Sequence, residues 1–156
     1  MNNKSLERLK LVHPLLMARV LNLNIAIEAA GEHIEVTEGL RSYSRQEALY
    51  AQGRTEPGPI VTKAPGGYSW HNYGLAVDVA PFVEYVPEWD LSNPTWQRIA
   101  DLAPSNGLFS GSQFIHMVDW PHLQLAEIPH SPTAEHRQIF KAGGIESVWK
   151  ELGLEA

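Results

Sequence analysis

The sequence contains no cysteine. This absence excludes a disulfide framework and every metal site built on thiolates. Any bound metal ion must therefore be held by histidine and carboxylate side chains, which narrows the metal chemistry to hydrolytic types.

Long apolar runs and clusters of positive charge are also missing. No segment approaches the ~20 apolar residues of a membrane-spanning helix, and no uninterrupted apolar stretch of the signal-peptide type follows the first eight residues. The formal net charge is −6, and the lysines and arginines are scattered. These features argue against nucleic acid or a membrane as a partner, and we expect synthesis in the cytoplasm.

What is present fits one globular domain. The chain has 156 residues, of which 44% are hydrophobic, so a single domain over residues 1–156 can bury a proper core. Apolar spacing predicts helical structure over residues 5–30, with Ser5 as N-cap and an interruption or restart at Pro14. Further patterns predict strands at 35–39 and 75–80, helices at 45–53, 94–102, 132–142 and 145–152, and a turn-rich segment at 108–118.

The first motif with residues that could bind a metal ion or take part in a reaction runs from Ser69 to Asp78. Side chains alternate along a strand, so Asp78 shares a face with two small alanines while the intervening valines fill the core. His71 precedes Asp78 by seven residues, and Gly74 permits an unusual backbone turn between them. We therefore expect His71 to enter from a loop folded back over the strand end.

The second motif runs from Asp119 to Leu125. On a strand, His122 and Gln124 share one face and the leucines that follow them face the core. Asp119 precedes His122 by three residues, and Pro121 breaks the local regularity. The Asp119 carboxylate can therefore lie near the imidazole without taking the same position on a metal ion.

Together the two motifs suggest a catalytic zinc site. Such a site takes three protein ligands and keeps one position for a water whose pKa falls to about 7; His71, Asp78 and His122 can supply the three. Asp119 can then exchange protons with water and leaving group, and Arg41 can stabilise a developing oxyanion. Spacing alone leaves open structural roles for the histidines and for nearby aromatic residues, and leaves Arg45 and Arg54 as competitors of Arg41.

At these residues the chain resembles the LAS group of zinc peptidases. Ser69 to Asp78 matches the pattern S-x-H-x-x-G-x-A-x-D, and Asp119-Trp120-Pro121-His122 resembles the second signature. The segment from Thr37 to Ser42, followed by Gln46, resembles the part that supplies a substrate-facing arginine. The resemblance covers about residues 5–126.

The resemblance implies an α+β fold, in which helices pack on a short antiparallel sheet that carries the zinc site. It implies Zn²⁺ on His71, Asp78 and His122, with Asp119 as general base and acid and Arg41 on the substrate. The same resemblance suggests further substrate contacts from Gln46, Ser69, Trp70 and Tyr73.

Within the group, the chain most resembles phage endolysins that cut between L-Ala and D-Glu of peptidoglycan stem peptides. The alternatives are a D-alanyl-D-alanine carboxypeptidase or dipeptidase, and a non-catalytic zinc-bearing binding module. Residues 109–118 depart from the Trp-Gly-Gly-Asp-like segment that such endolysins commonly carry. We expect a monomer without a separate cell-wall-binding domain, which reaches the wall through a separate pore-forming protein.

Overall fold

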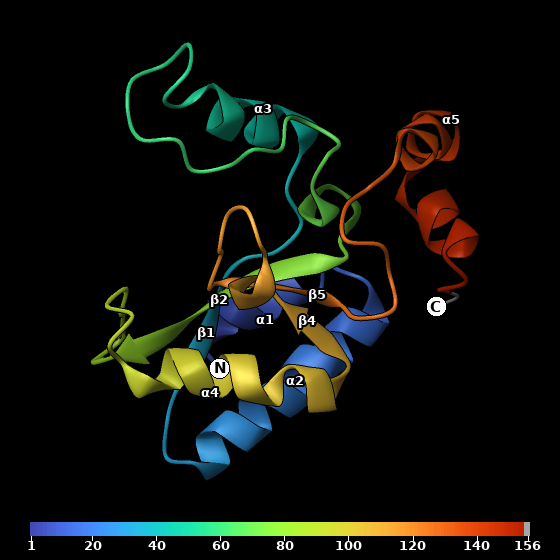
Figure 1. Ribbon diagram of the computed structural model, residues 1–156. Coiled ribbons are helices and arrows are strands. Elements are labelled where there is room, and N and C mark those ends of the chain that lie inside the picture. The colour runs from blue at the N-terminus through green and yellow to red at the C-terminus, as the bar shows by residue number, and fades with distance from the viewer. Residues whose placement is uncertain (155–156) are drawn as a thin grey trace.

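The computed structural model describes residues 1–154, which form an antiparallel sheet surrounded by helices (Figure 1). This arrangement confirms the predicted α+β fold. Within the described range, no helix combines the length and apolar character needed to cross a membrane. The elements are, in chain order, α1 (Asn3–Leu9), α2 (Pro14–Ala29), β1 (Ile34–Glu38), α3 (Tyr43–Ala51), the 3₁₀ turn η1 (Trp70–Tyr73), β2 (Ala76–Val83), β3 (Val86–Pro87), α4 (Pro94–Leu102), η2 (Pro104–Asn106), β4 (Leu108–Ser110), η3 (Gly111–Gln113), β5 (His122–Leu125) and α5 (Ala134–Glu151).

The sheet has the strand order β1-β2-β5-β4, and the short β3 pairs with the far end of β2. All pairings are antiparallel. Asp78 on β2 lies directly opposite His122 on β5 and, on its other side, opposite Glu38 on β1. The register of the two central strands therefore brings the two sequence motifs together.

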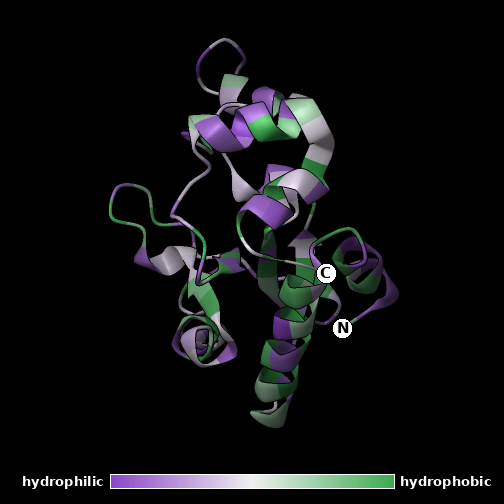
Figure 2. Cartoon of the chain, turned by 90° about the vertical axis from the view of Figure 1, so that its right-hand side faces the viewer, coloured by the Kyte–Doolittle hydropathy of each residue, from purple (hydrophilic) through white to green (hydrophobic). Residues whose placement is uncertain are grey.

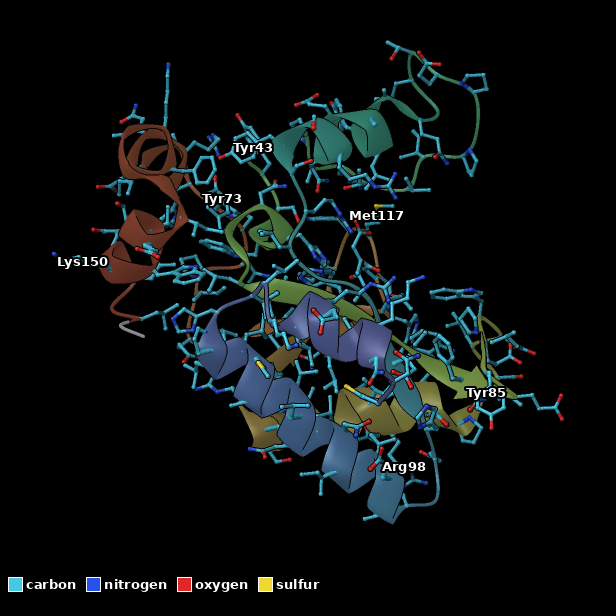
Figure 3. The ribbon with its side chains drawn as sticks, turned by 180° about the vertical axis from the view of Figure 1, so that it is seen from behind. Tyr43, Tyr73, Tyr85, Arg98, Met117 and Lys150 are labelled. Atoms are coloured by element: carbon cyan, nitrogen blue, oxygen red, sulfur yellow. The ribbon has the colours of Figure 1, made fainter. Side chains whose placement is uncertain are left out.

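The helices cover the sheet from two sides. Figures 1 and 3 show α2 and α4 on one side, with α3 and α5 on the other. Hydrophobic and hydrophilic residues both occur along the helices in Figure 2, as expected of helices that turn one face to a core. The fully buried core joins helical and strand residues, including Leu16, Val20, Leu23, Ile27, Val36, Val77, Val79, Leu123 and Leu125.

The N-terminal region forms two helices, as predicted, and the second begins at Pro14. The predicted cap is wrong, because Asn2 rather than Ser5 caps α1 and accepts a hydrogen bond from the Ser5 amide at 2.8 Å. Ser5 is buried inside the helix, where its hydroxyl accepts from the Val36 amide and donates to Glu35. Ser5 thus joins α1 to β1.

Two other regions refine the expectations from sequence. The predicted break between the last two helices is a kink inside α5, where Gly144 has φ 76° and ψ −168°. The segment expected to be only turn-rich contains β4, a strand of three residues, followed by η3. Local propensity could not identify so short a strand, since its pairing with β5 decides its conformation.

Buried Glu35 provides a test of how the N-terminus is held. Its side chain is 3% exposed, and it accepts hydrogen bonds from the Asn2 amide, from Ser5 and from His33. Burial alone would raise the pKa of Glu35, but the hydrogen bonds from Ser5 and Asn2 outweigh it and lower the pKa. The folded state therefore gains stability above the unfolded pKa of about 4.3, and loses it as the pH falls through the lower folded pKa.

We expect Glu35→Gln to reduce the free energy of unfolding by about 2 kcal/mol at pH 7, because charge-assisted hydrogen bonds are lost. The difference from the wild type should shrink as the pH falls below about 4. Urea unfolding, followed by circular dichroism at pH 7 and at a pH below about 4, measures this difference in the free energy of unfolding. Glu7→Gln, at an exposed pair with Lys10, is the control and should change stability little. A pH-independent difference would contradict this role for the charge.

Candidate metal centre and catalytic cleft

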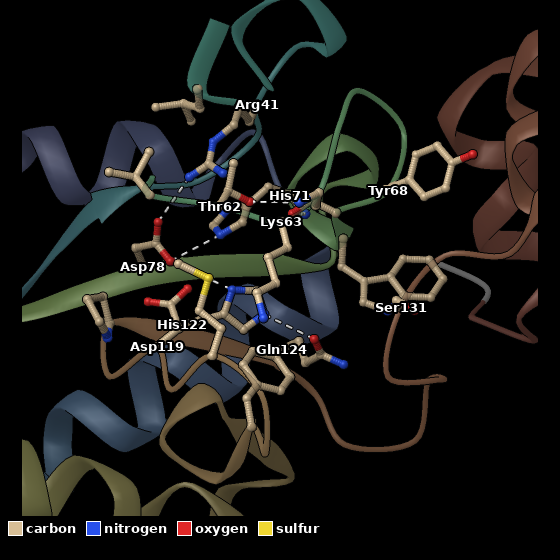
Figure 4. A pocket seen from close by; sticks show the side chains of 18 of the residues that line it. Arg41, Thr62, Lys63, Tyr68, His71, Asp78, Asp119, His122, Gln124 and Ser131 are labelled. Atoms are coloured by element: carbon tan, nitrogen blue, oxygen red, sulfur yellow. Dashed lines mark hydrogen bonds and ion pairs between the residues drawn. The ribbon is translucent and has the colours of Figure 1, made fainter. Parts of the chain in front are cut away.

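The structure brings His71, Asp78 and His122 together. One potential ligand atom from each of the three lies within 4.8 Å of the others. His71 Nε2 lies 3.1 Å from Asp78 Oδ1, and His122 Nδ1 lies 3.8 Å from the same oxygen. Both imidazoles are almost fully buried, so the three groups share one small space at the floor of a cleft (Figure 4).

The first motif folds locally in a way that aims His71 back at the strand. Ser69 caps η1 by accepting from the His71 amide, and Gly74 ends η1 in the left-handed conformation with φ 65°. The chain thereby reverses just before β2, as the sequence predicted for Gly74. His71 and Asp78, seven residues apart, meet across this reversal.

The hydrogen bonds of each imidazole determine which ring nitrogen faces the cluster. His71 Nδ1 lies 2.9 Å from the Gly39 carbonyl oxygen, which can only accept, so this nitrogen carries the hydrogen. Gln124 Nε2 donates to the Pro129 carbonyl, so its Oε1 faces His122 Nε2 at 3.0 Å and accepts from it. His71 Nε2 and His122 Nδ1 are then the ring nitrogens that face Asp78.

This donor set fits a divalent metal ion. Burial, then the nearby His71, lowers the pKa of His122 to about 4, so its ring is neutral at neutral pH. Its Nδ1 lone pair faces the Asp78 carboxylate at a distance too long for a hydrogen bond. Burial would raise the pKa of Asp78, but His71, which hydrogen-bonds to it, and Arg41 outweigh burial and keep the carboxylate ionised. Two imidazole nitrogens and a carboxylate oxygen that face one space are the ligand types of a catalytic zinc site.

Gln124 is a positioning residue for His122 whose role can be tested. It is 2% exposed, and its carbonyl holds the hydrogen of His122 on Nε2. Loss of a residue that hydrogen-bonds to a metal-binding histidine typically lowers metal affinity 10- to 100-fold. We expect Gln124→Leu to weaken zinc binding by about that factor, whereas Gln124→Glu, which still accepts the hydrogen bond, should retain affinity. Competition with a zinc chelator indicator measures both, and circular dichroism confirms folding.

Arg41 lies directly beside the cluster. Its guanidinium donates to both carboxylate oxygens of Glu38 at 2.9 and 2.7 Å, to Gln46 Oε1 at 3.1 Å and to Asp78 Oδ2 at 3.1 Å. Burial acts to lower the pKa of Arg41, but Glu38 and Asp78 raise it overall. These four bonds occupy four of the five N–H groups of an arginine and leave one on Nη1.

Asp119 lines the same cleft but makes no side-chain hydrogen bond within residues 1–154. Burial and the neighbouring Asp78 charge raise the pKa of Asp119 to about 6. A carboxylate in this state is mostly ionised at neutral pH and holds an accepted proton more readily than an ordinary aspartate. These are the properties of a general base that later acts as an acid.

The cluster lies in a cavity of about 980 Å³. Its walls come from both motifs, from the loop that contains Lys63 and from residues 114–119. Ser69 and Trp70, two of the four suggested substrate contacts, are among the residues that line it. Trp70 is also 1% exposed, and its indole donates to the Pro129 carbonyl.

The other two expected substrate contacts lie outside the cavity lining. Gln46 is fully buried and links Arg41 to the Ala64 carbonyl. Tyr73 is also fully buried, and its hydroxyl bonds to Tyr43 and to the Gly67 carbonyl. Figure 3 shows Tyr43 and Tyr73 close together. The structure thus places both residues in the packing that supports the cleft.

Sequence reasoning missed Glu38 as the bidentate partner of Arg41 and Lys63 as a residue of the cleft. Glu38 could have been found, since it precedes Arg41 by three residues with a carboxylate at a strand end. His136, another residue near the cleft wall, is 6% exposed. It caps α5 together with Thr133 and contacts Trp70.

Comparison with known proteins identifies the family. The profile described as VanY, D-alanyl-D-alanine carboxypeptidase, matches residues 9–107. The chain is 35% identical over 122 residues to the peptidoglycan L-alanyl-D-glutamate endopeptidase CwlK of Bacillus subtilis (strain 168), and the match covers 73% of each chain. The chain belongs to the VanY family. It is therefore a metallopeptidase, as the resemblance implied.

Solved structures of similar fold agree with this assignment. The L-Ala D-Glu endopeptidase ChiX of Serratia marcescens is 28% identical with a TM-score of 0.57, covering 80% of this chain and 88% of that one. A VanY D,D-pentapeptidase in complex with Zn(II) is 15% identical with a TM-score of 0.58, and the match covers 88% of this chain and 83% of that one. The second likeness concerns the fold alone. It confirms the predicted helices on an antiparallel sheet.

Proposed function

We propose that this VanY-family protein is a zinc-dependent peptidoglycan hydrolase that cleaves stem peptides between L-Ala and D-Glu. The observation that carries the choice of bond is the 35% identity to CwlK, an L-alanyl-D-glutamate endopeptidase. The cleft supports the hydrolytic chemistry, because the three candidate ligands, Asp119 and Arg41 all reach one cavity.

The residues of the cleft have separate roles in metal binding, proton transfer and substrate contact. His71, Asp78 and His122 would hold zinc, which supplies Lewis acidity and an activated water when bound. Asp119, with its pKa raised to about 6, accepts a proton and delivers it to the leaving amine. Arg41 holds Asp78 in place, and its remaining N–H on Nη1 is available to a substrate oxygen.

The extent of the cleft supports cleavage inside a chain rather than at its end. Tyr68 precedes β2, Pro132 follows β5, and Trp89 lies beyond the opposite end of β2; all three line the cavity. Because β2 and β5 are antiparallel, Tyr68 and Pro132 lie at one end of the ligand cluster and Trp89 at the other. A peptide can therefore extend in both directions from the scissile bond.

The second candidate is a D-alanyl-D-alanine carboxypeptidase or dipeptidase. It is favoured by the description of the matching family profile. Both reactions use the same ligands, base and arginine, so these residues do not separate the candidates, and only the extent of the cleft favours cleavage inside a chain.

Digestion of purified peptidoglycan separates the candidates. The zinc-loaded protein should release fragments with a new N-terminal D-Glu, identified by mass spectrometry. Release of D-alanine or its dipeptide would instead support the second candidate. Intact stem peptides after prolonged digestion would overturn both, and would favour a zinc-bearing binding module.

A bacteriolytic role is a narrower proposal. We propose that the protein acts as an endolysin that reaches the wall after release by a separate pore-forming protein. Co-expression with a pore-forming protein should cause a fall in culture turbidity, and expression alone should not. If the Asp119→Ala variant, co-expressed with the pore-forming protein, lysed cells as well as the wild type does, this result would contradict a role for the peptidase activity.

A further inference from the structure

Lys63 differs from the other cation of the cleft in having no carboxylate partner. Among the residues that line the cavity, only Arg41 and Lys63 are lysine or arginine. Arg41 is held by Glu38 and Asp78. Within residues 1–154, Lys63 forms no ion pair, and its ammonium donates only to the His116 carbonyl at 3.3 Å.

Lys63 lines the cleft as an exposed residue. It belongs to the loop between α3 and η1, whereas His116 lies on the opposite wall between η3 and β5. Figure 4 shows Lys63 among the side chains that line the cavity together with His71 and His122. A neutral carbonyl at 3.3 Å is a weak partner for an ammonium, and an ionised acceptor forms a stronger hydrogen bond. The cleft therefore offers an available cation to an anionic ligand.

The substrate of the proposed reaction carries a suitable anion. In a stem peptide, D-Glu supplies the nitrogen of the scissile bond and continues the chain through its side-chain carboxyl. Its α-carboxylate is therefore free and lies two bonds from the scissile nitrogen. In some cell walls this group is amidated to give D-isoglutamine, which is uncharged. Amidation of this carboxyl group therefore decides whether a negative charge lies next to the scissile bond.

We propose that Lys63 is a specificity-determining residue that binds the free α-carboxylate of D-Glu, so that the enzyme prefers unamidated stem peptides. This inference rests on the proposed L-Ala–D-Glu cleavage. On substrate binding, the ammonium exchanges the His116 carbonyl for the carboxylate. Arg41 is a weaker competitor for this anion, because Glu38 and Asp78 already neutralise its charge and its hydrogen bonds leave it one N–H.

The test compares two soluble muropeptides that differ only in D-Glu or D-isoglutamine. The wild-type enzyme should cleave the D-Glu substrate with a kcat/KM about tenfold higher, as expected for one charge-assisted hydrogen bond. Lys63→Met should bring this ratio close to one by raising KM for D-Glu, with kcat little changed. Lys63→Arg should restore the preference. Lys141→Met, at an exposed position on α5, is the matched control and should behave as wild type.

The outcomes separate this inference from the proposed function. Equal cleavage of both substrates by the wild type, or an unchanged ratio in Lys63→Met, would overturn the role of Lys63 and leave L-Ala–D-Glu cleavage intact. A parallel loss on both substrates in Lys63→Met would show a structural role and would also overturn it. Cleavage of neither substrate at the L-Ala–D-Glu bond would remove the proposed function and this inference together.

Discussion

Asp119→Asn is expected to lower kcat on peptidoglycan by about 10²- to 10⁴-fold while zinc remains bound, because the amide cannot accept the proton. The substitution keeps the size of the side chain and removes only its basicity. Asp119 lies in the cleft without being part of the three-ligand cluster. Turnover measured by mass spectrometry, together with zinc content by atomic emission, checks both parts.

His122→Ala is the comparison for this experiment. It removes a ligand that lies within 4.8 Å of its two partners, so zinc content and turnover should both fall. Equal loss of zinc in Asp119→Asn and His122→Ala would show that Asp119 is itself a ligand. Full activity of Asp119→Asn would exclude it as the base.

Gly111→Ala is expected to lower kcat by on the order of 10²-fold, since misplacement of catalytic groups by about 1 Å has costs of this size. A β-carbon at position 111 would lie 2.3 Å from the backbone oxygen of Asp119 and 2.8 Å from Cβ of His122. The Asp119 amide also donates to the Gly111 carbonyl at 2.9 Å. The added methyl group must therefore displace the backbone that carries both the base and a ligand.

Gly143→Ala is a matched control for Gly111→Ala. Its new β-carbon would also make a close contact, but with the Ser147 hydroxyl oxygen, at the end of a half-buried side chain that can rotate away. We expect wild-type activity and zinc affinity for this variant. Similar losses in both variants would show a general effect of glycine replacement rather than a displaced Asp119.

Part of the fold was predictable because its signals are local. Pro14 fixes the start of α2, Ser42 caps α3, and Gly107 ends η2 in the left-handed conformation. The cap of α1 was wrong because Ser5 is chemically able to cap a helix, while its buried contacts with β1 hold it one turn further in. Such contacts between distant segments leave no mark in the local pattern.

The sequence by itself determined the chemistry that this protein can perform. Without cysteine, the motifs around His71, Asp78 and His122 restricted a metal site to imidazole and carboxylate ligands, and Gly74 already indicated the chain reversal that brings His71 to Asp78. Only the tertiary structure decided which ring nitrogen of His71 faces the cluster, since the Gly39 carbonyl reaches it from the end of β1. It also decided which way the amide of Gln124 points toward His122, since the Pro129 carbonyl orients it. It also decided that Arg41 is neutralised while Lys63 is not, because ion pairs depend on distances across the sheet and the cleft that sequence spacing does not specify.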